Sequence, residues 1–266
     1  MTELLFAIAG MVIGLFSGFF GIGGGTITVP MLIAVFQGAG MHTDIAIRVA
    51  LSTSLAVAFA GSLTASVRNL RHLAPYRNRI LWMVAGSLSG TVAGVQAALL
   101  IPGSLLSKML AVVLAAVAIR YLTEKPAISA GTSDPAGSDW VFVFPGILVG
   151  IFSGMTGLGG GVLLIPLLVH FWKVGQRESV MISSLVIIPT VVAGLIQWAS
   201  VPSPVMPQGW VQVGFFSVTA GVPLIAGALA GGWLGAHLMH RTPSPLWKKF
   251  FAVFLLIVSV DLFLLH

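Results

Sequence analysis

The sequence predicts an all-α polytopic membrane protein built from two inverted repeats, each with a glycine-centred helical hairpin and three membrane-spanning helices. Three observations predict this fold: a charge-poor composition, a glycine-rich motif that occurs twice, and a distribution of Lys and Arg that differs between equivalent loops. Hydrophobic residues make up 57% of the chain and charged residues 8%, whereas a soluble domain carries about 25% charged residues. So few charges cannot cover a water-facing surface, and we expect the chain to lie in a bilayer.

The glycine-rich motif stands at 14–32 and again at 150–168, with an offset of 136 residues and identity at 10 of 19 positions. Each copy reads Gly-x-x-Ser-Gly-x-x-Gly-x-Gly-Gly-Gly and continues into an apolar run with a proline, Pro30 or Pro166. A repeat at half the chain length predicts an internal duplication.

The duplication divides the chain into a first membrane repeat at 1–122 and a second at 140–266. Between them, 123–139 is rich in Gly, Ser, Pro, Thr and Asp, and we expect it to be a flexible cytoplasmic linker. Six apolar runs approach the roughly 20 residues that a spanning helix needs, while four runs beside the glycine motifs are shorter. The expected spanning helices are 44–66, 80–101, 104–122, 176–199, 211–238 and 246–265, and the shorter runs are 4–20, 25–37, 140–156 and 161–172.

Equivalent loops of the two halves differ in charge. The loop 67–79 contains four arginines, whereas its counterpart 200–210 contains no charge. The turn 102–107 is uncharged, whereas its counterpart 240–249 contains Arg and Lys. Because Lys and Arg near helix ends mark the cytoplasmic side, equivalent loops lie on opposite sides and the repeats are inverted.

The inversion requires each glycine motif to be the vertex of a hairpin. The segment 140–172 then enters and leaves from the cytoplasm, with its vertex at Gly157–Gly161. The segment 4–37 enters from outside, with its vertex at Gly21–Gly25. Both chain termini lie outside in this arrangement, and 11 of the 13 Lys and Arg residues lie inside.

Each vertex is followed by a helix whose N-terminus lies at membrane depth. The first N–H groups of a helix have no partner within it and carry the positive end of the helix dipole. Two such N-termini pointing in from opposite faces favour an anion site near the bilayer midplane. Glycines leave the backbone open to a ligand, although they also permit two helices to cross closely.

Two hydroxyl clusters, Ser52-Thr53-Ser54 and Ser183-Ser184, occupy equivalent positions in the two repeats. They could line the same cavity, or each hydroxyl could bond to a carbonyl one helical turn back. The candidate substrate-binding residues are therefore Ser17, Gly21, Gly23, Gly24, Gly25, Thr26, Ser54, Ser153, Gly157, Gly159, Gly160, Gly161 and Ser184.

Three glycines spaced four residues apart also recur in each repeat, and this spacing favours helix packing over ligand contact. These glycines are Gly86, Gly90 and Gly94 in the first repeat and Gly227, Gly231 and Gly235 in the second.

Ionisable residues inside the apolar runs are few, and each lies near an end, where interfacial solvation is the favoured interpretation. They are Arg48, His170, Glu178 and Asp261. No acidic cluster could hold a metal, and no acid–base set suggests an enzyme. We expect neither a metal nor a cofactor.

The doubled motif at Gly14–Pro30 and Gly150–Pro166 resembles the TauE/SafE sulfite-exporter family, within the wider grouping of toluene-sulfonate uptake permeases. Thr53-Ser54-Leu55 matches the family's usual Thr-Ser-Leu, whereas Ser183-Ser184-Leu185 departs from it in the first residue. The resemblance covers nearly the whole chain. It implies transport of small sulfur-containing anions such as sulfite, thiosulfate, sulfoacetate or related organosulfonates, and substrates vary within the family.

We therefore expect a secondary transporter, and more specifically an exporter, that works by alternating access in a bacterial inner membrane. The expected partners are a small anionic substrate and the lipid bilayer, with a homodimer as an option and no nucleic acid. The alternatives are a transporter or channel for another small organic or inorganic anion, and a membrane scaffold that transports nothing.

Overall fold

The computed structural model describes residues 2–20, 24–66, 73, 75–123, 138–204, 209–238 and 245–264. The described chain is almost entirely helical, as the sequence predicts, with one short two-stranded hairpin. The elements are α1 (Thr2–Phe20), α2 (Gly25–Gly38), α3 (Thr43–Ser66), α4 (Arg77–Leu100), α5 (Gly103–Thr123), the 3₁₀ helix η2 (Asp139–Phe142), α6 (Val143–Thr156), α7 (Gly161–Phe171), α8 (Gln176–Ser200), β1 (Gln212–Val213), β2 (Phe216–Ser217), α9 (Val218–Leu238) and α10 (Pro245–Leu264).

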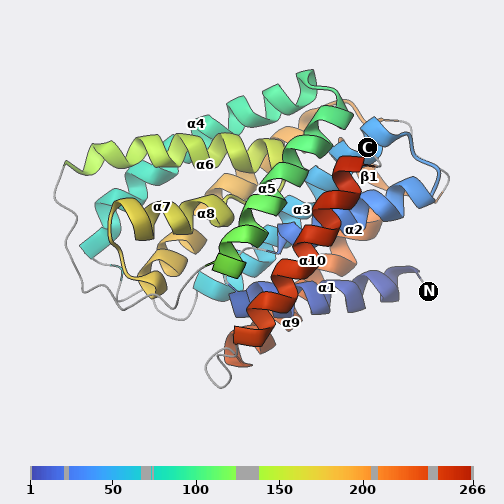
Figure 1. Ribbon diagram of the computed structural model, residues 1–266. Coiled ribbons are helices and arrows are strands. Elements are labelled where there is room, and N and C mark those ends of the chain that lie inside the picture. The colour runs from blue at the N-terminus through green and yellow to red at the C-terminus, as the bar shows by residue number, and fades with distance from the viewer. Residues whose placement is uncertain are drawn as a thin grey trace.

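Two helical hairpins enter the molecule from opposite ends (Figure 1). The α1–α2 hairpin occupies the right side of the view and the α6–α7 hairpin the left side, and their tips meet between them. Both termini lie at the right end. At 1.5 Å per residue, α2 is about 21 Å long and α7 about 16 Å, so neither crosses a hydrocarbon core of about 30 Å alone.

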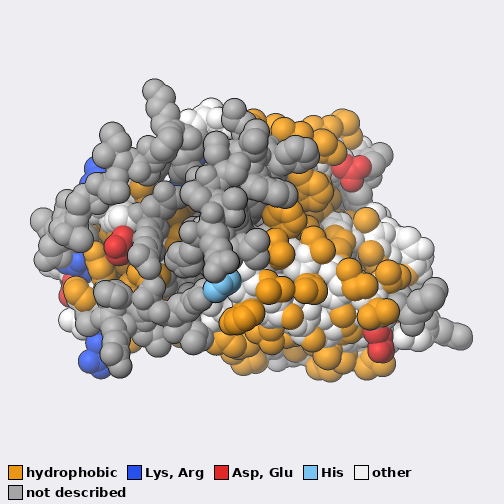
Figure 2. Space-filling view, turned by 90° about the horizontal axis from the view of Figure 1, so that it is seen from below, with side chains coloured by type: hydrophobic (Ala, Val, Ile, Leu, Met, Phe, Trp, Pro, Cys, Tyr) orange, Lys and Arg blue, Asp and Glu red, His pale blue; other side chains and the backbone are white. Residues whose placement is uncertain are grey.

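The α3 helix is the centre of the structure. In its apolar 18-residue window 83% of residues are buried, whereas the other five candidate spans are 39% to 50% buried. These other helices therefore present one face to protein and one to lipid (Figure 2). Exposed apolar side chains on them include Trp82, Val92, Val112, Ile196 and Trp233.

Six helices in the described part are long and apolar enough to cross a membrane. By length and composition they include Asp139–Thr156, which the sequence predicts as a hairpin arm. They do not include α10, whose described apolar part is the shorter segment Ala252–Leu264. The chain nevertheless turns back after Thr156, because α7 begins at Gly161 and runs toward the end from which α6 entered.

Helix contacts occur in equivalent pairs. The α1 helix packs on α9 and α6 packs on α4, so the first arm of each hairpin lies against a helix of the other repeat. In the same way α2 packs on α3 and α7 on α8, and α3 contacts α9 as α8 contacts α4. The α5 and α10 helices pack on each other and cross diagonally in front of the rest (Figure 1). This pattern fits the predicted duplication, while the sidedness of the repeats in a membrane stays a prediction.

The periodic glycines form both hairpin–helix interfaces, as the sequence predicts. A Cβ at Gly90 of α4 would lie 3.0 Å from Ile147 Cα of α6 and closer still to its carbonyl oxygen. On the other side, a Cβ at Gly231 of α9 would lie 2.7 Å from the carbonyl carbon of Met11 in α1. No real Cβ fits such spaces, so glycine permits these backbones to touch.

The predicted helix at 211–238 is wrong in its first seven residues. These residues form the β1–β2 hairpin, and α9 begins at Val218. The Ser217 N–H donates to Thr53 Oγ1 of α3 at 3.1 Å, and Ser217 Oγ accepts the Ala220 N–H at 3.4 Å. Ser217 thus caps α9, and tertiary contacts override the helical tendency of the apolar run before it.

The Lys and Arg side chains that are visible in Figure 2 gather at the left end of that view. Along the chain, the described basic residues stand near helix ends: Arg77 and Arg79 in the first turn of α4, Arg120 in the last turn of α5, and Lys173 between α7 and α8. Arg48 and Lys108 stand near the starts of α3 and α5. The side of a membrane that each of them faces stays a prediction.

An ion pair ties α4 to the start of the second hairpin. Arg79 Nε lies 3.0 Å from Asp139 Oδ1, and the Arg79 guanidinium lies 5.5 Å from the centroid of the Phe142 ring. These contacts hold η2 against the first turn of α4.

Some predicted features lie outside the described residues. They are Gly21 and Gly23 of the first vertex, 124–137 of the linker, and Arg68, Arg71 and Arg241 of the charged loops.

The glycine interfaces predict a stability effect. Gly90→Ala should lower the free energy of unfolding by about 1–3 kcal/mol, because the added Cβ pushes α4 away from α6. Thermal unfolding in detergent measures this as a lower Tm. Gly38→Ala is the matched control, because an added Cβ there has no atom within 4 Å. Equal Tm values for both variants would show that close backbone contact does not stabilise the fold.

The predicted orientation can be tested with single cysteines, because the native chain has none. A cysteine at the exposed His42, between α2 and α3, should react with an impermeant thiol reagent in intact cells. A cysteine at the exposed Thr123, at the end of α5, should react only after permeabilisation. The reverse pattern would overturn the orientation.

Candidate functional site

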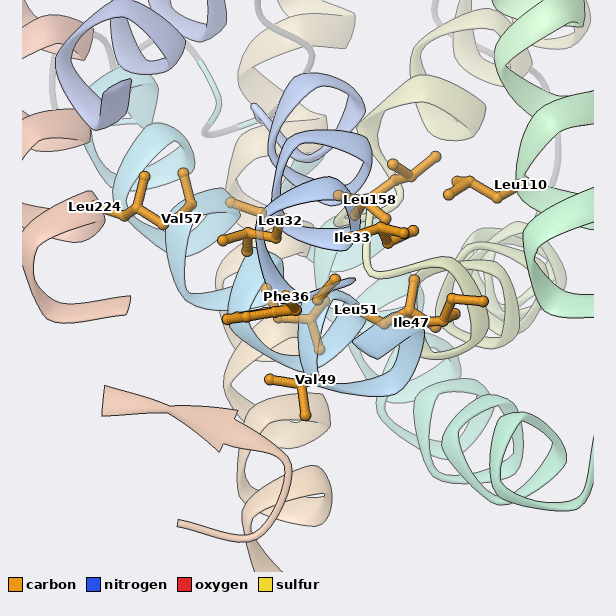
Figure 3. Packing of buried hydrophobic residues seen from close by; sticks show 14 of the residues in the cluster. Leu32, Ile33, Phe36, Ile47, Val49, Leu51, Val57, Leu110, Leu158 and Leu224 are labelled. Carbon is orange, nitrogen blue, oxygen red and sulfur yellow. The ribbon is translucent and has the colours of Figure 1, made fainter. Parts of the chain in front are cut away.

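The two vertices touch at the centre of the molecule. A Cβ at Gly25, the first residue of α2, would lie 2.6 Å from Leu158 Cα and 3.0 Å from the Gly157 carbonyl oxygen. Leu158 is fully buried and belongs to the same cluster as Ile33 of α2 and Leu110 of α5 (Figure 3). The absence of a side chain at Gly25 therefore lets one hairpin tip rest on the other.

Glycine is also required at the residue that precedes each second arm. Gly24 (φ 71°) caps α2 and Gly160 (φ 78°) caps α7, both in the left-handed conformation. The Gly24 carbonyl accepts the Thr28 N–H at 3.1 Å, and the Gly160 carbonyl accepts the Leu164 N–H at 3.0 Å. The equivalence of these two caps at an offset of 136 residues extends the predicted duplication to local backbone geometry.

A serine from the first arm lies beside each cap. Ser153 Cβ is 3.5 Å from the Cβ position of Gly160, and Ser17 Cβ is 3.5 Å from that of Gly24. Both serines are buried, Ser153 completely and Ser17 with 6% exposure. The Ser153 hydroxyl has no hydrogen-bond partner in the described structure. A buried, unpaired hydroxyl beside a helix N-terminus is costly unless a ligand satisfies it.

The N–H groups at the second vertex are unpaired as well. Within the described residues, the amides of Gly159, Gly160, Gly161 and Val162 donate to no acceptor. The first N–H groups of α7 also carry the positive end of its dipole. By contrast, the Gly157 and Gly160 carbonyls both accept hydrogen bonds. The unpaired amides at the N-terminus of α7 favour an anion over a cation at that point.

The Ser54 hydroxyl is hydrogen-bonded to the vertex backbone and is not free. Its Oγ lies 2.7 Å from the Gly157 carbonyl oxygen and 2.8 Å from the Leu51 carbonyl oxygen. Ser184, its equivalent in α8, bonds to the Val180 carbonyl at 2.8 Å, one helical turn back. Direct contact of either hydroxyl with a substrate stays a prediction, and both hydroxyls have protein partners in this structure.

The remaining candidates have buried positions around the vertices. Thr26 is buried in the first turn of α2, and Ser52 and Ser183 are buried with unpaired hydroxyls. Gly159 packs against α3 and α8, because its Cβ position lies 2.9 Å from Ala58 Cβ and 3.6 Å from Ile187 Cγ2.

A further hydroxyl pair was not among the sequence candidates. Thr190 Oγ1 of α8 lies 2.7 Å from Ser87 Oγ of α4, and both residues are fully buried. Ser87 follows Gly86 of the periodic glycines, so a hydroxyl next to a packing glycine is the signal that could have identified it. The pair joins α4 to α8 and lines no described cavity.

The ionisable residues fit interfacial positions. The Arg48 guanidinium donates through Nη2 to the Ile101 carbonyl at the end of α4, at 3.1 Å. Asp261 is exposed near the end of α10. The structure does not describe the side chain of His170. No group of three or more metal-ligating side chains occurs among the described residues.

Comparisons with known proteins place these features in one family. The sequence profile of the family "Sulfite exporter TauE/SafE" matches residues 6–262. A probable membrane transporter protein of Methanocaldococcus jannaschii is 29% identical over 234 residues, which cover 85% of this chain and 84% of that protein. A probable membrane transporter protein of Haemophilus influenzae is 24% identical over 270 residues, 98% of each chain. No solved structure matches this chain.

The unpaired Ser153 hydroxyl yields a prediction that separates a binding role from a packing role. Ser153→Ala should weaken binding of a small oxyanion about 10- to 100-fold, because it removes one hydrogen bond to a charged ligand. It should leave the stability of the unliganded protein unchanged or slightly higher, because no protein hydrogen bond is lost. Anion-dependent thermal stabilisation in detergent measures both effects.

The control is Ser89→Ala, which removes a hydroxyl on the exposed side of α4 that bonds the Gly86 carbonyl at 2.8 Å. This variant should bind anions like the wild type. If Ser153→Ala also binds normally, the hydroxyl takes no part in the site.

Proposed function

Because the chain belongs to the sulfite exporter TauE/SafE family, we propose that it is a secondary transporter that exports small sulfur-containing anions across the plasma membrane. Sulfite, thiosulfate and organosulfonates such as sulfoacetate are the candidate substrates. The observation that carries the proposal is the vertex at Gly159–Val162, where unpaired amides at the N-terminus of α7 lie beside the buried Ser153, whose hydroxyl is unpaired.

The two hairpins provide the moving parts of an alternating-access cycle. Each second arm begins at the centre, and each first arm lies on a glycine-lined face of the other repeat. Rocking of one repeat against the other opens the central site first to one side and then to the other. In this structure the described vertex residues Gly24, Gly25 and Gly157–Gly161 are buried, which corresponds to a closed state.

Export fits the energetics of an anion carrier. An inside-negative membrane potential favours anion exit by about 2.3 kcal/mol per charge per 100 mV. Uptake would need a coupled cation or proton, and the deepest carboxylate that the sequence offers, Asp261, is exposed on α10. An enzyme is disfavoured, because the sequence brings no acid–base set to the vertices and the relatives are named membrane transporters.

A flux assay in liposomes tests the substrate class. The reconstituted protein should show saturable flux of at least one anion among sulfite, thiosulfate, sulfoacetate and sulfate, with taurine and lactate as comparison solutes. Saturation at low rates supports a carrier, whereas flux that does not saturate supports a channel. Flux of lactate without any sulfur anion would move the assignment to another anion class, and the absence of all flux would support a scaffold.

Vertex variants connect that flux to the site. Gly24→Leu and Gly160→Leu should abolish flux, because each places a side chain at a left-handed residue beside Ser17 or Ser153. Gly38→Leu, where an added side chain starts in open space, should retain it. Transport that survives both vertex changes would contradict a substrate site at the vertices.

A further inference from the structure

The helices around the vertices carry no full charge along most of their lengths. All of α2, α6, α7 and α9 lack Asp, Glu, Lys and Arg, and in α1, α3, α4 and α8 such residues occur only in the first two turns. The uncharged stretches are 4–43, 49–67, 80–107, 140–172 and 179–240. A substrate at the vertices therefore meets no lysine or arginine from these helices.

The histidines in the described part of the chain also lie away from the centre. His42 precedes α3, His170 is the next-to-last residue of α7, and His237 is the next-to-last residue of α9. His42 and His237 are exposed, and His237 stacks on Trp233. The charged residues of α1, α3, α4 and α8 occur near their first turns, as Glu3, Asp44, Arg48, Arg77, Arg79, Arg177 and Glu178.

The positive potential that these helices supply at the second vertex thus comes from partial charges. The N-terminus of α7 contributes the equivalent of about half a unit charge, and the amides and the Ser153 hydroxyl add oriented dipoles. Apolar groups surround them: the Cβ position of Gly160 lies 2.6 Å from Val149 Cγ1, and that of Gly159 lies 3.6 Å from Val191 Cγ1. In such a medium the desolvation cost of an ion grows with the square of its charge, so a dianion costs about fourfold more than a monoanion.

Building on the proposed function, we propose that this site accepts sulfur oxyanions only in their singly charged form. Dipoles and one hydroxyl balance a single delocalised charge, and the uncharged stretches around the vertices offer no cationic side chain to balance a second. Hydrogen sulfite and simple sulfonates are then substrates. Sulfite dianion, sulfate, thiosulfate and the doubly charged form of sulfoacetate are excluded.

The test compares the fluxes of anions that are similar in size but differ in charge. The liposomes contain the wild-type protein, and protein-free liposomes are the blank. Methanesulfonate stays singly charged across the pH range, so its flux reports any titration of the protein itself. Sulfite passes from its singly to its doubly charged form near neutrality. At fixed total sulfite, the flux relative to methanesulfonate should fall about tenfold per pH unit once the dianion predominates. Sulfate should show no flux above the blank.

The outcomes separate this proposal from the proposed function. Sulfate flux, or sulfite flux that is constant or rises as the dianion forms, would overturn the charge rule while leaving a sulfur-anion transporter. Flux of neither methanesulfonate nor sulfite, with flux of thiosulfate or sulfate, would overturn the charge rule in the same way. The absence of flux for every sulfur anion would overturn the proposed function, and the charge rule with it.

Discussion

Direct backbone contact between each hairpin and a helix of the other repeat is the interaction on which the rest of the structure depends. Lipid tails are as apolar as leucine, so burial of apolar side chains gives helices little reason to associate in a bilayer. Close van der Waals contact remains, and glycines at 86, 90 and 94 of α4 and at 227, 231 and 235 of α9 permit it. Because α1 packs on α9 and α6 on α4, each repeat holds the hairpin of the other with its tip at the centre.

The tips then meet a second constraint. Irregular backbone at membrane depth is tolerated only where protein or a wet cavity surrounds it. Protein groups satisfy one carbonyl at each tip: Ser54 bonds the Gly157 oxygen, and Thr28 bonds the Gly24 oxygen through both its N–H and its hydroxyl. The amides of Gly159, Gly160, Gly161 and Val162 receive no such help from the described residues. The backbone alone therefore leaves N–H donors that need an acceptor.

The sequence predicted the helical membrane fold and the glycine interfaces, because each depends on a local pattern: a run length or a spacing. The features that escaped prediction depend on distant partners. Ser54 was a candidate ligand, and its partner Gly157 lies 103 residues away in the chain. The composition of 211–217 is typical of a helix, but α9 begins only at Val218. The hydrogen bond from Ser217 to Thr53 of α3 and the capping role of Ser217 determine this start. Tertiary hydrogen bonds of this kind leave no periodic trace in a sequence.

A site made of dipoles also determines which step of a transport cycle responds to voltage. An empty site without charged side chains carries no net charge when it changes sides, so the return step is insensitive to the membrane potential. The loaded step moves the single charge of the substrate, and the potential acts on it in full. Under the proposed export, an inside-negative potential drives the cycle outward without a coupled ion. A lysine at the vertex would reverse this arrangement, because the loaded carrier would be neutral and the empty carrier positive. The lack of such a residue in 140–172 therefore assigns the voltage dependence to the loaded step, whereas the net direction of transport depends on the membrane potential and the substrate gradient.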